Sequence, residues 1–271
     1  MRLQIRHRTT LRYDQPVGYA IQVLRMMPRR HDGQQIEDWS ITVAGRRQPL
    51  PGQVDGYGNW VHLHSRNGSH ELTDVVVSGV VEVSDRGGLV SGADEPLPAR
   101  FYLRQSASTR PDEAMTALAH GAGGAGEPLD RLHRLSAVIA ARVAPEPAGV
   151  PLAHAHEALA AGKGGVADVV HLMLGCARLL GIPARYVAGY RHEGEGGAPR
   201  ESPHAWIEAY VDGTGWVAFD PLLGERVGDR HVRVAVGPDY WAAAPVRGTW
   251  RGAAEEAQTV AVQVAAAEMT Q

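Results

Sequence analysis

The chain has 271 residues, of which 44% are hydrophobic and 21% are charged, and its net charge at pH 7 is −3. These values are ordinary for a globular protein of one large or two modest domains, and they give no reason to expect binding to nucleic acid or to an anionic membrane. The N-terminus lacks the apolar segment of a signal peptide, no apolar run approaches the roughly 20 residues that span a bilayer, and Cys176 is the only cysteine. We therefore expect a cytoplasmic protein without an intrachain disulfide; its oligomeric state is not indicated.

Residues 1–105 are expected to form an N-terminal antiparallel β-sandwich. They contain short runs of β-branched, aromatic and alternating residues, separated by turn signals such as DGQQ, DGYGN and SRNGS. Short strands at this spacing are typical of a sandwich or of a curled antiparallel sheet. We assign this region to a first domain, and residues 106–271 to a second one.

The second domain is expected to be α+β, with helices first and an antiparallel sheet after them. Four helices are predicted in the segments PDEAMTALAHGA, LDRLHRLSAVIAARV, AHEALAAG and VADVVHLMLGCARLLG. The last of these has no wide polar face, which predicts burial on nearly all sides. Strands follow, with a tight DGTG hairpin turn and a final strand at TVAVQVAAAE. The loop 194–202 is predicted to be mobile.

Two of the predicted strands carry a histidine and a carboxylate. His204 begins HAWIEAY, and Asp220 ends WVAFD after the hairpin. Antiparallel pairing can place the two side chains together, where the carboxylate would fix the imidazole tautomer and stabilise an imidazolium. A nucleophile at the start of the buried helix, next to Gly165, would complete a catalytic triad. There the helix N-terminus would lower a thiol pKa and offer backbone N–H groups to an oxyanion.

These segments resemble those of bacterial transglutaminase-like proteins, which belong to the cysteine-protease-like superfamily. The resemblance rests on CARLLGIPARYVAGY, PHAWIEAY, GWVAFDPLLG, HVRVAVGPDY and APVRG in the second half, and on HRTTLRYDQPV, LRMMPRR and DGYGNWV in the first. It covers nearly the whole chain. It implies a transglutaminase core behind an N-terminal β-domain, with His204 and Asp220 in the positions of the catalytic base and of its orienting partner.

The chain departs from the family's sequence pattern at the position of the nucleophilic cysteine. When Asp168 and His171 are aligned with the family's Asp and His, that position falls on Val166; an alternative register with a one-residue deletion places it on Ala167. Neither side chain carries a reactive atom. The second register would also fit an engineered Cys-to-Ala change. Cys176 lies ten residues along the helix from Val166, roughly 15 Å along its axis, so it is not expected to substitute.

Four further residues are candidates for lining a substrate site: Gly165, Asp168, His171 and Trp206. The alternative for His171 is a core histidine bonded to backbone, and the alternative for Trp206 is core packing. A metal or ligand pocket made of His171, His204 and Asp168 has no supporting ligand spacing. The sequence therefore indicates no metal and no other cofactor.

The resulting hypothesis is a pseudoenzyme that binds a peptide, an acyl or amine ligand, or a partner protein through a retained cleft. Without the thiol, no acyl-enzyme can form by the family's route. One alternative is an enzyme with thiol-independent acyl-transfer or hydrolytic chemistry that uses His204 and Asp220. Another is a thiol-dependent acyltransferase or protease whose native cysteine has been replaced by Ala or Val.

Overall fold

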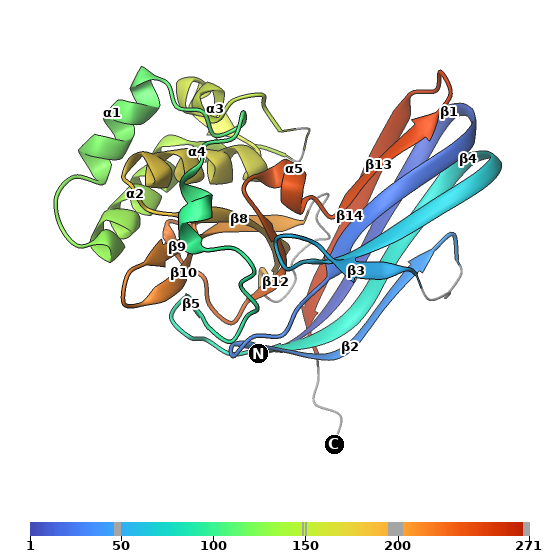
Figure 1. The fold of residues 1–271 in the computed structure, drawn as a ribbon, viewed down its shortest axis with the longest axis horizontal. Helices are drawn as coiled ribbons and strands as arrows, with labels where there is room; N and C mark the ends of the chain where they lie inside the picture. Colours follow the sequence, from blue (N-terminus) through green and yellow to red (C-terminus); the bar gives the residue numbers. More distant parts are fainter. Residues whose placement is uncertain (46–49, 148, 150, 195–202, 268–271) are drawn as a thin grey trace.

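The computed structural model describes residues 1–45, 50–147, 149, 151–194 and 203–267. It confirms the predicted α+β class. A sheet of long strands packs beside a second layer, which consists of the helices and a smaller sheet (Figure 1). Most of the loop predicted to be mobile, at 195–202, lies outside the described residues. Within the described residues, no helix is both long and apolar enough to cross a membrane.

The first sheet has six antiparallel strands, in the order β13-β1-β4-β2, with β14 also paired to β1 and β3 to β4. The strands are β1 (Arg2–Met27), β2 (Gln34–Val43), β3 (Gly52–Val54), β4 (Trp60–Val83), β13 (Val246–Arg251) and β14 (Glu256–Ala266). The sheet therefore takes strands from both ends of the chain, and β13 and β14 lie in the range we assigned to the second domain. Residues 1–105 contribute β1 to β4 to this single antiparallel sheet, which matches the alternative to a sandwich, and the short strand at Leu89–Val90 to the second sheet.

The second sheet runs in the order β11-β10-β9-β8-β12, with β5 paired to β10. Its strands are β5 (Leu89–Val90), β8 (Ala184–Arg191), β9 (His204–Val211), β10 (Gly215–Asp220), β11 (Glu225–Arg226) and β12 (His231–Gly237). The predicted hairpin is confirmed, since Val211 pairs with Gly215 across a turn in which Gly213 has a φ of 77°. A separate parallel pair is formed by β6 (Ala144–Pro145) and β7 (Lys163–Gly164).

All four predicted helices are present. They are α1 (Glu113–Ala122), α2 (Pro128–Arg142), α3 (Ala155–Ala161) and α4 (Val166–Leu179); a 3-10 turn at Ala99–Leu103 and the short α5 (Tyr240–Ala243) add to them. Asp112 caps α1 by accepting a hydrogen bond from the Met115 N–H at 2.7 Å. The predicted burial of α4 is confirmed: its residues 168–178 are all buried, because α1, α2, α3 and the second sheet surround it.

Residues of β9 alternate between two faces of the second sheet. Ala205, Ile207 and Ala209 belong to the core cluster that includes α4, whereas Trp206 packs in a separate cluster with Val187 and Ala218. The alternation therefore puts His204, Trp206 and Glu208 on one face, away from the side chains that contact α4.

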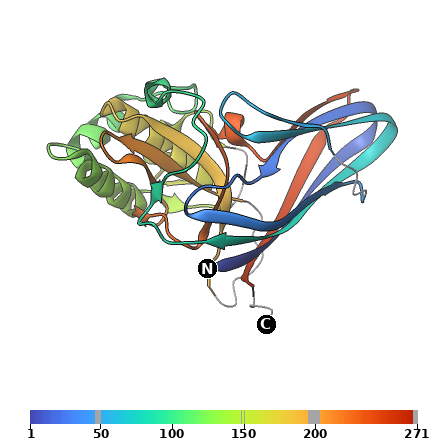
Figure 2. The same ribbon diagram turned by 60° about the horizontal axis from the view of Figure 1, so that its bottom comes forward.

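The two sheets share a hydrophobic core. The inner face of the first sheet contributes Leu3, Ile5 and Val81, which pack in one cluster with Tyr190 and Val232 of β8 and β12. Figure 2 shows the first sheet beside the body that holds the second sheet. The partner layer of the first sheet is thus the second sheet, and this pairing takes the place of the sandwich we expected within residues 1–105.

Polar contacts fix how the first sheet meets the second. The Asn59 side chain binds both backbone groups of Val236, and the Gln34 side chain binds both backbone groups of Arg233, at distances of 2.7–2.9 Å. Each amide side chain thereby pairs with a backbone N–H and a backbone C=O of β12, as a residue of a neighbouring strand would.

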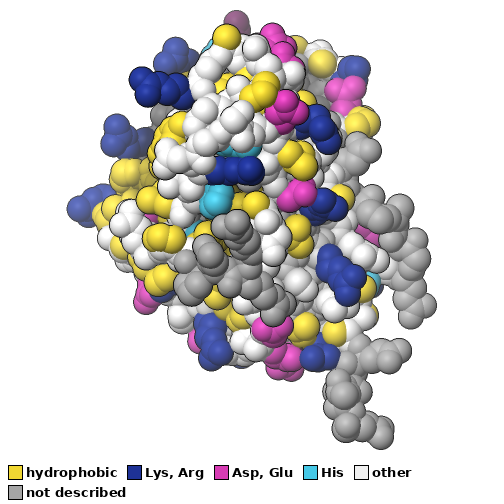
Figure 3. Space-filling model, turned by 90° about the vertical axis from the view of Figure 1, so that its right-hand side faces the viewer, with side chains coloured by type: hydrophobic (Ala, Val, Ile, Leu, Met, Phe, Trp, Pro, Cys, Tyr) yellow, Lys and Arg dark blue, Asp and Glu magenta, His cyan; other side chains and the backbone are white. Residues whose placement is uncertain are grey.

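Among the described residues, the face opposite the helices carries no single charged patch. Figure 3 shows Lys and Arg side chains spread among acidic, apolar and uncharged groups on that face. This distribution fits the small net charge of the chain.

Candidate active site

His204 and Asp220 form the hydrogen-bonded pair that the sequence predicts. His204 is the first residue of β9 and Asp220 is the last residue of β10, and the imidazole Nε2 lies 2.6 Å from the carboxylate Oδ2. Both side chains are buried, with exposed fractions of 2% and 0%. Asp220 Oδ1 also accepts a hydrogen bond from the Leu222 N–H at 3.0 Å, which orients the carboxylate.

The hydrogen-bond pattern determines the tautomer of His204. An ionised carboxylate only accepts hydrogen bonds, so the proton of a neutral His204 ring sits on Nε2 and Nδ1 carries the lone pair. That Nδ1 atom is buried and has no hydrogen-bond partner among the described residues. In a triad, the ring nitrogen that does not contact the carboxylate accepts the proton of the nucleophile, and in His204 that nitrogen is Nδ1.

Burial and hydrogen bonding shift both pKa values of this pair downward. Burial lowers the pKa of His204 below its usual value, and the bond to Asp220 offsets this only in part. Burial alone would raise the pKa of Asp220, but hydrogen bonds from His204 and His231 outweigh it and hold that pKa well below its usual range. The pair is therefore a neutral imidazole beside a carboxylate at pH 7.

His231 is a site residue that our sequence reasoning missed. It begins β12, and its Nε2 lies 3.2 Å from Asp220 Oδ2, the atom that His204 already contacts. The signal was present in the sequence, because His231 opens the HVRVAVGPDY segment, but we gave it no role. Within the described residues, the cluster whose ligand-type atoms lie close enough for a metal ion is His204, Asp220 and His231.

Trp206 packs against both histidines. Its ring centroid lies 6.2 Å from that of His204 and 5.3 Å from that of His231, and only 1% of its surface is exposed. Gly189, opposite His204 on β8, makes room for it, since a Cβ there would come within 2.5 Å of the indole. These contacts match the alternative of core packing for Trp206, and a role toward substrate stays a prediction.

The expected nucleophile position carries no reactive group. Val166 is the first residue of α4, after the N-cap Gly165, and it packs partly buried on the core cluster that includes Ala205. Ala167 packs on the same cluster. Both registers considered in the sequence therefore place an apolar side chain in the first turn of the helix.

Asp168 holds the first turn of α4. Its Oδ2 accepts a hydrogen bond from the Gly165 N–H at 2.9 Å, and its Oδ1 accepts one from the Leu152 N–H at 2.8 Å. Burial raises the pKa of Asp168, and these two bonds offset part of the increase. The contacts give Asp168 a capping role, and a role toward substrate stays a prediction.

His171 lies further along α4 and contacts α5. Its Nε2 accepts a hydrogen bond from the Tyr240 N–H at 3.0 Å, and its ring lies 5.6 Å from that of Tyr186. Burial lowers the pKa of His171 to about 4. These contacts match the alternative of a core histidine bonded to backbone.

The single thiol is far from reactive. Cys176 is fully buried, its Sγ lies 3.8 Å from the Met115 carbonyl oxygen, and burial raises its pKa to about 12. A thiol in this state is protonated at pH 7, and only the thiolate is a strong nucleophile.

Comparison with known proteins identifies the relatives of this chain. Residues 3–82 match the bacterial transglutaminase-like N-terminal region, and residues 116–221 match the transglutaminase-like superfamily. An uncharacterized protein of Mycobacterium leprae is 26% identical, with 97% of this chain and 98% of that protein covered. An uncharacterized protein of Mycobacterium bovis is 24% identical, with 91% and 87% covered.

Among solved structures, the chain is similar to a protein named as a candidate cysteine protease from Cytophaga hutchinsonii. The TM-score is 0.76 at 20% identity, and the alignment covers all of this chain and 92% of the other. At this identity the likeness shows a shared fold.

Proposed function

Because the chain belongs to the transglutaminase-like superfamily, we propose that it keeps the family's cleft but performs no thiol chemistry. In this proposal it binds a peptide, another acyl or amine ligand, or a partner protein at that cleft. One observation carries the proposal: Asp220 holds His204, whose Nδ1 atom has no partner among the described residues, while the two positions considered for the nucleophile carry Val166 and Ala167.

The loss of the thiol removes the covalent route. A Val or Ala side chain has no lone pair with which to attack an acyl group. In a serine protease the removal of the nucleophile lowers kcat by about 10⁶-fold. Cys176 does not compensate, since it is buried in the middle of α4 with a raised pKa.

A second candidate function follows from the same imidazole. A neutral ring whose Nδ1 carries the lone pair is the form that acts as a general base, and Asp220 would stabilise the imidazolium that results. His204 could then activate water, or an amine of the substrate, against an acyl group. The two candidates differ in turnover: the first gives binding alone, and the second gives hydrolysis that is lost in His204→Gln.

The test measures binding and turnover on the same protein. Labelled glutamine-containing peptides and primary amines are titrated into the wild-type chain, and release of ammonia or incorporation of amine is followed in parallel. Saturable binding without turnover supports the first candidate. Turnover that disappears in His204→Gln supports the second, and the absence of both binding and turnover contradicts the proposal.

We predict that Val166→Cys alone will not give robust transamidation. The family carries a glutamine beside its nucleophile, which supplies an oxyanion donor, and this chain has Ala167 there. Loss of one such donor lowers kcat by about 10²–10³-fold. The variant with both Val166→Cys and Ala167→Gln is therefore expected to exceed the single variant by about that factor, as measured by amine incorporation into a glutamine peptide.

The matched control adds His204→Gln to the double variant, and its rate of amine incorporation should fall to the background rate. High activity in Val166→Cys alone would contradict the importance of position 167. Activity of the double variant that survives His204→Gln would show that the new thiol does not use this imidazole.

A further inference from the structure

Three side chains of metal-ligating type converge at the end of the second sheet. His204, Asp220 and His231 come from the starts of β9 and β12 and the end of β10, and all are buried. Their ligand-type atoms lie within 4.8 Å of one another, and both imidazole Nε2 atoms approach the same carboxylate oxygen, at 2.6 Å and 3.2 Å. A pair would suffice for a catalytic dyad, so the second histidine needs its own explanation.

The cluster is not a complete hydrogen-bond network. Among the described residues, the Nδ1 atoms of His204 and His231 and the Nε1 atom of Trp206 are buried without a partner. Hydrogen bonds to ordered water are expected at these three atoms, because a buried polar group is costly to leave unpaired. Both Nδ1 atoms lie on the sides of the rings that do not face Asp220, so they do not compete with Nε2 for a ligand held at the cluster.

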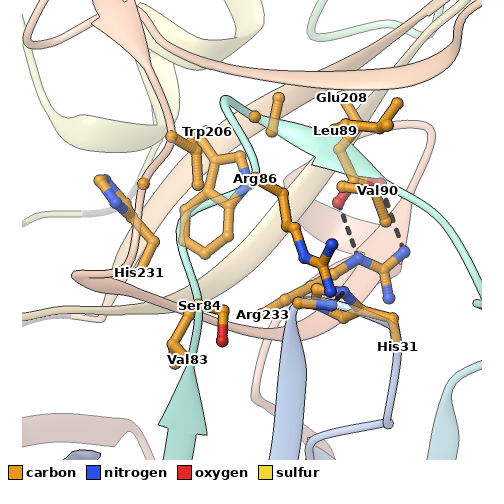
Figure 4. A pocket seen from close by; sticks show the side chains of 15 residues that line it. His31, Val83, Ser84, Arg86, Leu89, Val90, Trp206, Glu208, His231 and Arg233 are labelled. Carbon is orange, nitrogen blue, oxygen red and sulfur yellow. Dashed lines mark hydrogen bonds and ion pairs between the residues drawn. The ribbon is translucent and has the colours of Figure 1, made fainter. Parts of the chain in front are cut away.

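A small cavity lies directly beside the cluster. It has a volume of about 40 Å³ and is lined by Trp206 and His231, together with Ser84 and Arg86 from the end of the first sheet (Figure 4). A site needs at least about 10–15 Å³ of such volume to hold one water molecule. The cavity therefore has room for a water molecule next to His231, the one member of the cluster that lines it.

We propose that His204, Asp220 and His231 bind a divalent transition-metal ion of the zinc type, with a water molecule completing the coordination. Two imidazoles and one carboxylate suit such ions, which take three protein ligands and a water in open sites. Mg²⁺ and Ca²⁺ prefer all-oxygen ligand sets, so this cluster selects against them. The inference does not rest on the proposed function, because it concerns binding of the metal alone.

The distances are close to those that a metal ion requires. Ligand atoms bound tetrahedrally at about 2.0–2.1 Å lie roughly 3.3 Å apart. The separation of 3.2 Å between His231 and Asp220 already matches, and the 2.6 Å between His204 and Asp220 must open by about 0.7 Å. On binding, each ring offers its Nε2 lone pair to the ion and carries its proton on Nδ1.

The experiment titrates Co²⁺ and then Zn²⁺ into the untagged, metal-stripped full chain at pH 7. Visible d–d bands of a four- or five-coordinate cobalt site, with one ion per chain and displacement by Zn²⁺, are expected. His231→Asn and Asp220→Asn should each weaken Zn²⁺ binding by about 100-fold or more, because each removes a ligand. His120→Asn is the control, since His120 is an exposed histidine on α1.

Two results would overturn the proposal. One is the absence of saturable binding to the folded wild-type chain. The other is binding that neither His231→Asn nor Asp220→Asn weakens, which would assign the metal to other groups such as the stacked His154 and His156. If the variants fail to fold, X-ray absorption of the zinc complex formed by the variant with both His154→Asn and His156→Asn decides: two imidazoles with oxygen donors support the site, and loss of binding or another donor set contradicts it.

Discussion

Glu208→Gln is expected to lower the free energy of unfolding by about 3–5 kcal/mol, because it removes the negative charge from a buried ionic network. Glu208 is fully buried on β9, and its two oxygens accept hydrogen bonds from Arg185 Nε and Arg233 Nε, each at 2.7 Å. Burial alone would raise the pKa of Glu208, but the two guanidinium groups outweigh it and lower that pKa to about 2. Glutamine keeps the shape but removes the counter-charge of Arg233 and leaves Arg185 with Glu95 as its remaining ion-pair partner among the described residues.

The matched control is Glu95→Gln. Glu95 also binds Arg185, but its side chain is 31% exposed, so solvent screens the pair and the expected loss is about 1 kcal/mol or less. Urea unfolding at pH 7 followed by tryptophan fluorescence measures both variants. A Glu208→Gln protein within about 1 kcal/mol of wild type, or a larger loss for Glu95→Gln, would contradict this account of the network.

The buried histidines His7 and His171 are expected to lower stability by about 4 kcal/mol between pH 7 and pH 5, and His31 and His204, whose pKa values burial also lowers, add to this loss. Burial lowers the pKa values of His7 and His171 from 6.5 to about 4 in the folded state. Between these values the unfolded chain binds more protons than the folded one, so falling pH favours unfolding. Each histidine contributes a loss of about 2 kcal/mol over this interval.

Urea unfolding at pH 7, 6 and 5 measures this slope. His7→Gln should remove about 2 kcal/mol of this loss, because one titrating group disappears, and exchange of the exposed His120 for Gln is the control. Glu208 acts at lower pH: its folded-state pKa is depressed, so its contribution is lost only as pH falls from about 4.5 toward 2. A stability that is flat from pH 7 to pH 5 would contradict the burial of His7 and His171 as neutral rings.

Local sequence signals predicted the helices and the hairpin well, because their causes are local. Asp112 before α1 and Gly181 after α4 mark helix ends, and the apolar spacing within α4 predicted its burial. By contrast, β1 is one strand of 26 residues, although its sequence suggests three short strands, at LQIRH, LRYD and IQVLRMMP. The register of its pairing with β4 shifts between Arg12 and Val17. The residues between them, which have the composition of a turn, therefore form an irregularity within one continuous strand.

Long-range pairing could not be predicted in this way. The partner of β1 includes β14, more than 200 residues away in the chain, and nothing in the local pattern of either segment specifies the other. In the candidate site, too, the local contact could be predicted and the long-range contact could not. The contact between His204 and Asp220 follows from a hairpin of neighbouring strands, whereas His231 reaches Asp220 from β12, which is not adjacent to β10 in the sheet.

The central claim is that the described residues place no reactive nucleophile beside His204, and electrophile labelling tests it most directly. The native protein is treated with iodoacetamide at pH 7 and analysed by intact mass and peptide mapping. We expect no rapid adduct on the folded chain, and labelling of Cys176 only after unfolding, because its thiol is buried with a raised pKa. Rapid stoichiometric labelling of the folded protein, on Cys176 or on any residue near His204, would contradict the account.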